Sequence, residues 1–400
     1  MRLLIIGHTA HYLRDGQIVG WGPTIKEVNW LARSFDSLTH LACFHHSPAP
    51  DSALPYDTDK VHFVPVPPAG GPSLRDKLRV IQVVPQYISA IIKYLPTADV
   101  IQVRSPGALG LCAMLTLGFT RRKFRWTKYA GNWGETGTIT PSFAFQRWWL
   151  KNGFTNGPIT VNGKWPNSPR YIYSFDNPSL TLKEIINARR FCANKQLTSP
   201  VRLIFVGRLE SAKGVGICLD IVRKLLNHFE VHLEVLGDGP ELSKFKAMCA
   251  SLEIEPFVTF HGWVPHDEVK RHLAEVDFIL LPSSASEGWP KVLSEAMAYG
   301  VVPIASNVSA IPQILSETHT GFALPPSDAD QYAQAILNLV KEPLKWKAMI
   351  QSGLHAAPRF SYEKYILKLN NMFNSYYGTS PMDQVVVHEM RKQIERFYAS

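Results

Sequence analysis

The chain has 400 residues, of which 46% are hydrophobic and 19% charged, and its formal net charge is +9 at pH 7. This length favours two domains over one, and the apolar content is sufficient for two cores. No apolar run approaches the roughly 20 residues of a membrane span. The five cysteines are scattered, which is typical of buried reduced thiols and not of a disulfide framework. We therefore expect a cytoplasmic protein.

The excess positive charge lies in the first half of the chain. Residues 1–180 hold 19 Lys and Arg against 10 Asp and Glu, whereas residues 181–400 hold 23 of each kind. A basic half predicts an anionic partner. Residues 121–128, RRKFRWTK, place five cations in eight positions. This pattern favours peripheral contact with the inner face of a membrane, or a lipid-diphosphate acceptor, over nucleic acid, with a simple solvated face as the alternative.

Short apolar runs alternate with helical patterns along the first domain. The predicted strands lie at residues 3–7, 38–44, 61–66, 99–103, 124–131 and 158–163. The predicted helices lie at residues 23–35, 74–95, 107–118 and 143–152, with Pro85 as a kink in the second. Asn-Pro within residues 177–181 then breaks the pattern.

The alternation restarts after Pro200. Strands are predicted at residues 201–207, 231–237, 257–264, 277–283 and 301–306. Helices are predicted at residues 213–228, 240–251, 266–275, 290–299, 329–340, 344–357 and 361–376. The last two follow no strand, so we expect residues 361–400 to return to the first domain.

Two such series predict an α/β protein. Strands that alternate with helices of this length form βαβ units around a parallel sheet. The sequence therefore predicts two doubly wound, Rossmann-like domains that face a cleft, at residues 1–178 and 179–360. Ligands of such sheets bind beyond the carboxyl ends of the strands.

One candidate site is the stretch SEGWPKVLSEAM at residues 286–297. Glu287 follows a predicted strand and Pro290 fits the first turn of a helix. Glu295 lies about one turn inside that helix, where a buried carboxylate needs donors such as a ribose diol. Alternatively, both acids simply favour a helix N-terminus. Backbone N–H groups that would face an anion there belong to Gly288, Trp289, Lys291 and Val292.

A second cluster, VGRLESAKGVG at residues 206–216, follows the first strand of the second domain. Arg208 offers planar bidentate hydrogen bonds and Lys213 a mobile point charge, a combination that suits a diphosphate. Gly214 permits close approach of the backbone. Two solvated loop cations are the alternative.

These two clusters resemble a known family when they are taken with GDGPE (237–241), FHGWV (260–264) and EGWPKVLSEAMAYGVVPIAS (287–306). The pattern is similar to the retaining glycosyltransferases of family 4, the group 1 glycosyltransferases. It covers residues 200–326 strongly and the first domain only in outline. The resemblance implies a GT-B fold and metal-independent transfer, with retention, from a nucleotide sugar to a hydroxyl of a glycan or lipid-linked acceptor. Bacterial surface polysaccharide or glycolipid synthesis is the implied setting.

The same resemblance implies the role of each residue. Arg208 and Lys213 would bind the diphosphate and assist its departure, and Glu287 would contact the donor sugar. Glu295 would hold the ribose, and a bulky Trp289 would narrow the choice of donor. The remaining implied donor contacts are Gly237, Trp263 and Val264 at the nucleobase, and the backbone at Gly288, Trp289, Pro290, Lys291 and Val292.

In the first domain the family has a Gly-rich loop after the first strand. GQIVGWGPT, with Gly20 and Gly22, is the candidate here. Many members carry a His after a later strand, where this chain reads KYAGNWGET. Asn132, as the catalytic substitute, and Glu135 are the polar residues there, with loop capping as the alternative. His8 is a candidate acceptor contact, with a purely structural histidine as the alternative.

Two other functions fit the same fold. One is a nucleotide-sugar epimerase, and the other is a non-catalytic nucleotide-sugar-binding protein. We expect no cofactor and no metal, because Asp-x-Asp at residues 57–59 reads as a surface turn and at residues 328–330 as a helix N-cap.

Overall fold

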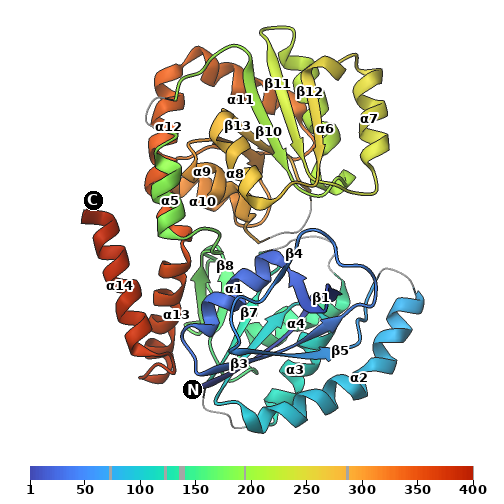
Figure 1. The fold of residues 1–400 in the computed structure, drawn as a ribbon, viewed down its shortest axis with the longest axis vertical. Coiled ribbons are helices and arrows are strands. Elements are labelled where there is room, and N and C mark those ends of the chain that lie inside the picture. The colour runs from blue at the N-terminus through green and yellow to red at the C-terminus, as the bar shows by residue number, and fades with distance from the viewer. Residues whose placement is uncertain (72–73, 121–123, 135–139, 193–194, 285–287, 400) are drawn as a thin grey trace. The chain divides into compact units, whose positions relative to one another are not determined.

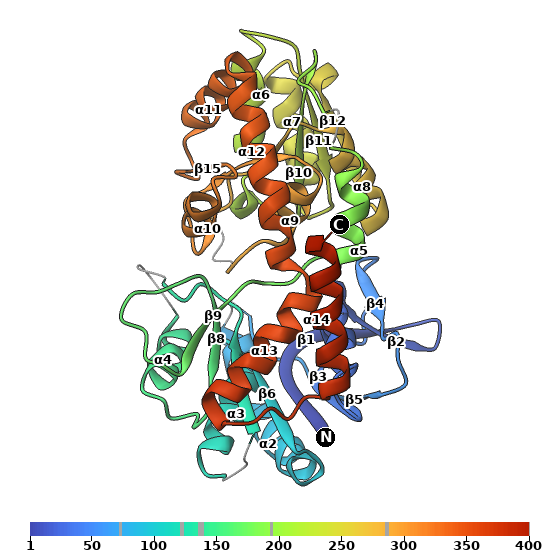
Figure 2. The same ribbon diagram turned by 90° about the vertical axis from the view of Figure 1, so that its left-hand side faces the viewer.

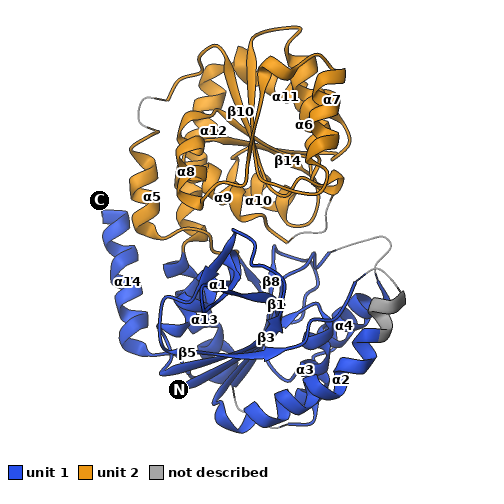
Figure 3. Ribbon diagram, turned by 45° about the vertical axis from the view of Figure 1, so that its right-hand side comes forward, with its two compact units in different colours: residues 1–175, 362–400 blue, residues 176–361 orange. Residues whose placement is uncertain are grey.

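The structure, a computed structural model, describes residues 1–71, 74–120, 124–134, 140–192, 195–284 and 288–399. The chain forms two compact units (Figure 3), unit 1 with residues 1–175 and 362–400, and unit 2 with residues 176–361. The boundaries expected from the sequence were 178/179 and 360/361. Each unit is built around its own sheet (Figure 1).

Unit 1 contains the strands β1 (Arg2–Arg14), β2 (Gln17–Trp21), β3 (Ser37–Phe44), β4 (Ala53–Pro55), β5 (Val61–Val66), β6 (Val100–Ser105), β7 (Phe124–Tyr129), β8 (Ile159–Asn162) and β9 (Ile172–Phe175). Its helices are α1 (Gly22–Ala32), α2 (Leu74–Tyr94), η1 (Leu95–Thr97), α3 (Ala108–Gly118), α4 (Pro141–Lys151), α13 (Tyr362–Tyr377) and α14 (Gln384–Ala399). The parallel strands run in the order β5-β3-β1-β6-β7-β8-β9. The strand β2 pairs antiparallel with the end of β1, and β4 pairs antiparallel with β2.

Both faces of this sheet are buried, which explains its near-continuous apolar strands. Leu4 and Ile6 of β1 pack in a core with α2 and α3. Leu3 and Ile5 point to the opposite face, because side chains alternate along a strand, and pack in a core with α1, α13 and α14. The C-terminal helices, which lie side by side in Figure 2, thus complete the core of unit 1, and their predicted return is confirmed.

The expected Gly-rich loop is wrong, because β1 continues to Arg14 and pairs with β2. Gly20 lies in β2, where an added Cβ would be 2.6 Å from Cδ2 of His11. Gly22 is the first residue of α1, and a Cβ there would be 2.7 Å from the carbonyl oxygen of Ser52. Close packing within unit 1 therefore explains both glycines.

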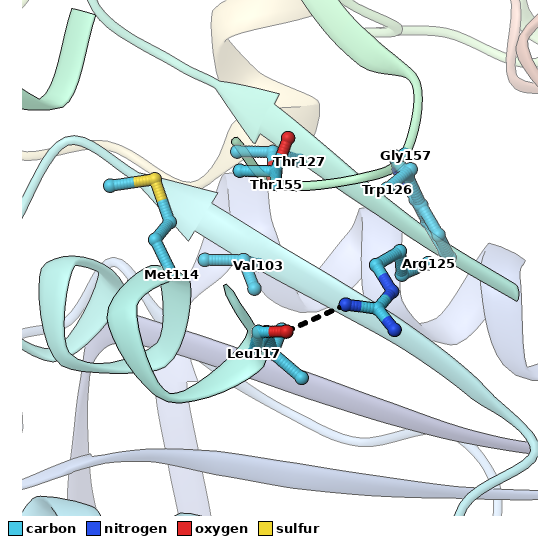
Figure 4. A pocket seen from close by; sticks show the side chains of 8 residues that line it. All are labelled: Val103, Met114, Leu117, Arg125, Trp126, Thr127, Thr155 and Gly157. Carbon is cyan, nitrogen blue, oxygen red and sulfur yellow. Dashed lines mark hydrogen bonds between the residues drawn. The ribbon is translucent and has the colours of Figure 1, made fainter. Parts of the chain in front are cut away.

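The described part of the basic stretch, residues 124–128, is buried and is not the exposed surface that we expected. Arg125 and Lys128 belong to β7 and are 3% and 7% exposed. Arg125 donates hydrogen bonds to the carbonyl oxygens of Leu117 (2.8 Å) and Thr120 (2.7 Å), as Figure 4 shows for Leu117. The cavity of about 10 Å³ beside it has room for no more than one water. Arg121, Arg122 and Lys123 lie outside the described residues.

Unit 2 contains the strands β10 (Val201–Val206), β11 (Val231–Leu236), β12 (Val258–Gly262), β13 (Phe278–Leu281), β14 (Val302–Ser306) and β15 (Phe322–Leu324). Its helices are α5 (Leu182–Arg189), η2 (Ser211–Lys213), α6 (Val215–Leu225), α7 (Leu242–Ser251), η3 (Glu255–Phe257), α8 (His266–Glu275), α9 (Lys291–Ala298), α10 (Ile311–Thr318), α11 (Ala329–Lys341), α12 (Pro343–Ala356) and η4 (Ala357–Phe360).

The sheet of unit 2 is parallel, in the order β12-β11-β10-β13-β14-β15. The chain begins in the middle at β10, moves outward to β12, and then returns to β13 on the other side of β10. Such a reversal creates a topological switch point between the adjacent strands β10 and β13, where α/β sheets bind ligands. None of the described helices combines the length and the apolar content that crossing a bilayer requires.

Candidate functional site

The carboxyl ends of β10, β11 and β12 are tied together through their backbones. The Gly207 N–H donates to the Leu236 carbonyl oxygen (3.0 Å), and the Gly237 N–H donates to that of Gly262 (2.7 Å). Gly237 has φ +138°, and an added Cβ would lie 1.9 Å from the Gly207 carbonyl oxygen. Only glycine fits this position, which brings the three loops to one edge of the sheet.

The loop that carries the predicted diphosphate ligands is braced from α7. The Ser211 N–H donates to Oε1 of Glu241 (2.7 Å) and its hydroxyl to Oε2 (2.5 Å). Lys244 Nζ lies 2.6 Å from Oε2. Hydrogen bonds from Lys244 and then from Ser211 lower the pKa of Glu241 to about 2. The brace fixes the η2 turn, and no signal in the sequence predicted it.

Arg208 and Lys213 lie on the two sides of this turn. The Arg208 side chain is 63% exposed and its Nη2 is 2.5 Å from Oε1 of Glu210. Exposed pairs of this kind contribute little to stability, so Arg208 can exchange Glu210 for an anionic ligand. Burial lowers the pKa of Lys213, Glu210 raises it, and the positive charge of Arg208 lowers it again. The two cations are therefore close enough to repel each other, as a shared diphosphate site requires.

This loop touches the end of β13, across the switch point. The Ser284 N–H donates to the carbonyl oxygen of Ala212 (2.9 Å), and so does the Ser283 hydroxyl (3.2 Å). Gly214, in the left-handed region with φ +82°, brings its Cα so close that a Cβ would lie 2.3 Å from the Pro282 carbonyl oxygen. The loop that follows β10 and the start of the loop that follows β13 are thus neighbours in space.

The N-terminus of α9 has the form of an anion site. Pro290 is its N-cap residue, not part of the first turn, and no side chain of the described residues caps this helix end. Lys291 and Val292 form the first turn and are half-buried. The preceding Gly288 is held in place, since its carbonyl oxygen accepts from the hydroxyl of Ser309 (2.9 Å). The positive end of the helix dipole at this N-terminus favours an anion.

Trp289 does not have the predicted role. Its side chain is 2% exposed, and its Nε1 donates to Oγ of Ser294 (2.7 Å). The indole stacks on Phe360, with centroids 5.1 Å apart and planes 10° from parallel. The expectation that its bulk narrows the choice of donor is therefore wrong, because the ring fills the core of unit 2.

Glu295 has a partner that the sequence did not reveal. Its carboxylate is 7% exposed, and Oε1 lies 3.2 Å from Nε2 of His266. His266 begins α8, directly after the loop that holds Trp263 and Val264. Trp263 is 41% exposed and Val264 half-buried. An acid inside α9, an imidazole at the start of α8 and an open indole face on the loop before α8 thus form a set that suits a nucleoside.

In unit 1, Asn132 follows the simpler alternative of a loop cap, whereas the acceptor contact of His8 stays a prediction. Oδ1 of Asn132 accepts from the Gly134 N–H (3.1 Å), so Asn132 caps its own turn. His8 lies in β1 and is exposed, but its ring lies against Gly107. Desolvation of the ring and then the charge of Arg104 lower the pKa of His8.

Two predicted acids, Glu135 and Glu287, lie outside the described residues. Their predicted roles at the acceptor and at the donor sugar stay predictions.

Comparison with known proteins places this site in context. Residues 191–355 match the model of the family described as glycosyl transferases group 1. The chain is 34% identical over 151 residues to the amylovoran biosynthesis glycosyltransferase AmsK of Erwinia amylovora, over 36% of this chain and 37% of that protein. It is 30% identical over 148 residues to the putative colanic acid biosynthesis glycosyltransferase WcaL of Escherichia coli K12, over 36% of each. The matched part thus spans little more than a third of these relatives.

Solved structures extend the likeness to both units. The sucrose-phosphate synthase tll1590 of Thermosynechococcus elongatus superposes with a TM-score of 0.71 at 16% identity, over 95% of this chain and 99% of that one. Anabaena Alr3699/HepE in complex with UDP gives a TM-score of 0.67 at 16% identity, over 94% and 100%. At this identity the likeness shows the fold, which is the GT-B fold predicted from the sequence.

Proposed function

We propose, from the match of residues 191–355 to the model of the group 1 glycosyl transferases, that the chain transfers a sugar from a nucleotide-sugar donor to a hydroxyl acceptor. The observation that carries the proposal is the meeting of the loops after β10 and β13 at the switch point of unit 2. There the Ser284 N–H bonds to Ala212, between the cations Arg208 and Lys213.

The proposed chemistry follows from the charges around this point. Departure of a nucleoside diphosphate leaves negative charge on its phosphates, and preorganised donors that stabilise this charge lower the barrier. Arg208, Lys213 and the N-terminus of α9 supply such donors, so we propose that no metal assists the step. Transfer proceeds with retention, and the departing phosphate takes the proton of the acceptor hydroxyl. Glu295 and His266 hold the ribose, and Glu287 the sugar.

The test is to incubate the protein with a panel of UDP-, GDP- and ADP-sugars. The release of the nucleoside diphosphate measures turnover, and the anomeric configuration of the product shows whether transfer retains or inverts it. UDP-sugars come first, because HepE was crystallised with UDP. Arg208→Ala and Glu295→Gln should each weaken nucleotide binding by about 10- to 100-fold, since a hydrogen bond to a charged group contributes roughly 1.5–3 kcal/mol. Turnover should be equal with and without added Mg²⁺ or Mn²⁺.

Arg202→Ala is the matched control. Arg202 has a similarly exposed guanidinium, 47% against 63%, but lies near the amino end of β10, paired with Glu275. If Arg202→Ala and Arg208→Ala bound UDP equally well, the site would be misplaced. Formation of an epimer would instead identify an isomerase, and binding without turnover a non-catalytic protein.

We further propose that the acceptor is a glycan or lipid-linked hydroxyl of bacterial exopolysaccharide synthesis. The names of AmsK and WcaL, which concern amylovoran and colanic acid, support this assignment. Membrane extracts that contain lipid-linked oligosaccharides are the acceptor source to test, with free oligosaccharides as the comparison. Transfer to neither would contradict the assignment.

Contact with a membrane is proposed through α4, which bears exposed aromatic side chains. Phe145 and Trp148 of α4 are 39% and 52% exposed, and Phe154 just beyond it is 42% exposed. The Trp148 ring lies 5.7 Å from that of Phe145 and 5.4 Å from that of Phe154. Lys151 adds positive charge in the last turn. Aromatic rings beside cations are typical of surfaces that bind anionic interfaces.

Sedimentation with phosphatidylglycerol and phosphatidylcholine vesicles tests this surface. Trp148→Ser should weaken binding to the anionic vesicles by about tenfold, because it removes apolar area from the interface. Trp21→Ser is the control, since Trp21 is 44% exposed but belongs to β2. Equal binding by both variants would assign no role to α4.

A further inference from the structure

The outer strands of unit 2 carry polar side chains on one face, where a parallel sheet is usually apolar. Along β11, Val231, Leu233 and Val235 are buried, whereas the intervening His232 and Glu234 are half-buried. His232 and Glu234 therefore share the opposite face of the sheet. Such a pattern needs an explanation, because buried parallel strands normally read as continuous apolar runs.

Neighbouring elements add more imidazoles to this face. Nε2 of His261, in β12, makes a short contact with Oε2 of Glu234. The ring of His272, in α8, lies 4.5 Å from that of His261, centroid to centroid. Nε2 of His232 is 3.5 Å from Oε1 of Glu234 and 2.9 Å from Oγ1 of Thr259. Three imidazoles thus converge on a single carboxylate.

The geometry points to a metal site, and we propose that Glu234, His261 and His272 bind a divalent transition metal of the Zn²⁺ class. One ligand atom from each residue lies within 4.8 Å of the other two. Two imidazoles and one carboxylate are a ligand set typical of Zn²⁺ and related ions, and less suited to Mg²⁺ or Ca²⁺, which prefer oxygen. His232, with Nε2 3.5 Å from Oε1 of Glu234, is close enough to orient the second oxygen of that carboxylate.

The arrangement would also be hard to explain by pairing alone. A single carboxylate is satisfied by one charged imidazole, whereas here a second and a third approach it from another strand position and from a helix. A cation at the centre uses His261 and His272 together with the carboxylate, since each neutral imidazole offers a nitrogen lone pair. None of these residues belongs to the predicted donor site, so the metal is separate from the metal-independent transfer proposed above. It would fasten α8 to the edge strand β12 and its neighbour β11.

The experiment is a competition titration of tag-free, full-length protein with Zn²⁺ against a chromophoric chelator, with Mg²⁺ in excess throughout. One equivalent should bind tightly to the wild type. His272→Ala and Glu234→Gln should each lose at least about 100-fold in affinity, since even changes behind the ligands cost 10- to 100-fold. His228→Ala is the matched control, an exposed histidine of unit 2 outside the cluster, and should bind as the wild type does.

Two further measurements make the result decisive. Wild-type protein loaded with Co²⁺ should show the intense visible bands of a four-coordinate site, absent from His272→Ala. X-ray absorption of the Zn²⁺ form should show two imidazoles and one carboxylate, a result that needs no variant to fold. Equal Zn²⁺ affinity in the wild type and His272→Ala, or weak binding at many histidines without a one-to-one site, would overturn the proposal.

Discussion

A buried charge network in unit 1 offers a sharp test of the energetics of this fold. Glu27 of α1 is 1% exposed, and its carboxylate accepts from three donors. These are Arg104 of β6 at 3.0 Å, Lys128 of β7 at 2.6 Å and the Tyr365 hydroxyl of α13 at 3.0 Å. The network thus ties a helix, two strands and the returning C-terminal helix together, around one negative and two positive charges.

Glu27→Gln keeps the shape but removes the negative charge that Arg104 and Lys128 share. At an effective dielectric constant of about 20, Coulomb's law gives roughly 6 kcal/mol for a pair 2.6 Å apart. Part of this is offset by relaxation, and breaking buried pairs typically costs about 3–5 kcal/mol. We expect a loss of that size in the free energy of unfolding of unit 1, a large part of the roughly 5–15 kcal/mol that holds a domain together.

The loss should depend on pH. Burial lowers the pKa of Lys128 to about 8, although Glu27 raises it. Without Glu27 the folded-state pKa falls further below its unfolded value of 10.5. As the pH rises toward 8, Lys128 in the variant can therefore lose its uncompensated proton, and the deficit shrinks. The deficit of Glu27→Gln in the free energy of unfolding, relative to the wild type, should therefore be larger at pH 6 than at pH 9.

Urea unfolding read by hydrogen exchange in β6 and β7 measures this loss, with unit 2 as the internal control. The double variant Glu27→Gln/Lys128→Met restores the net charge of the cluster and should be more stable than Glu27→Gln alone. A loss under about 1 kcal/mol, or a deficit that is the same at pH 6 and pH 9, would refute the reasoning.

Two further predictions concern unit 2. Burial raises the pKa of Asp277 to about 6, against its unfolded value of 3.8. The folded state therefore binds this proton more tightly, and the free energy of unfolding falls as the pH rises from about 4 to 6. In thermal unfolding, Asp277→Asn should remove this decline, and an unchanged pH profile in the variant would contradict the prediction. Gly237→Ala places a Cβ 1.9 Å from the Gly207 carbonyl oxygen. It should therefore lower stability by about 1–3 kcal/mol and weaken UDP binding in calorimetry. Gly378→Ala is the control, because Gly378 also has a positive φ but no atom within 4 Å of an added Cβ, and this variant should leave UDP binding unchanged.

The sequence by itself determined most of the parallel strands of the two sheets and the loops that follow them. Apolar periodicity distinguishes strand from helix, because each element buries one face or both. Turn residues such as Gly214 and Gly237 mark where the backbone must come close to another strand. The proximity of Arg208 and Lys213 could be predicted from the sequence as well, since both lie on one short turn.

Only the tertiary structure decided which distant residues meet. His266 reaches Glu295 across 29 positions, and Glu27 reaches Tyr365 across 338. The direction of the Trp289 side chain, inward to Phe360, was equally hidden. Periodicity gives the face on which a residue lies but not the order of the strands, and strand order determines which faces come together. The imidazoles around Glu234 meet for that reason, because β11 and β12 are neighbours and α8 crosses beside them.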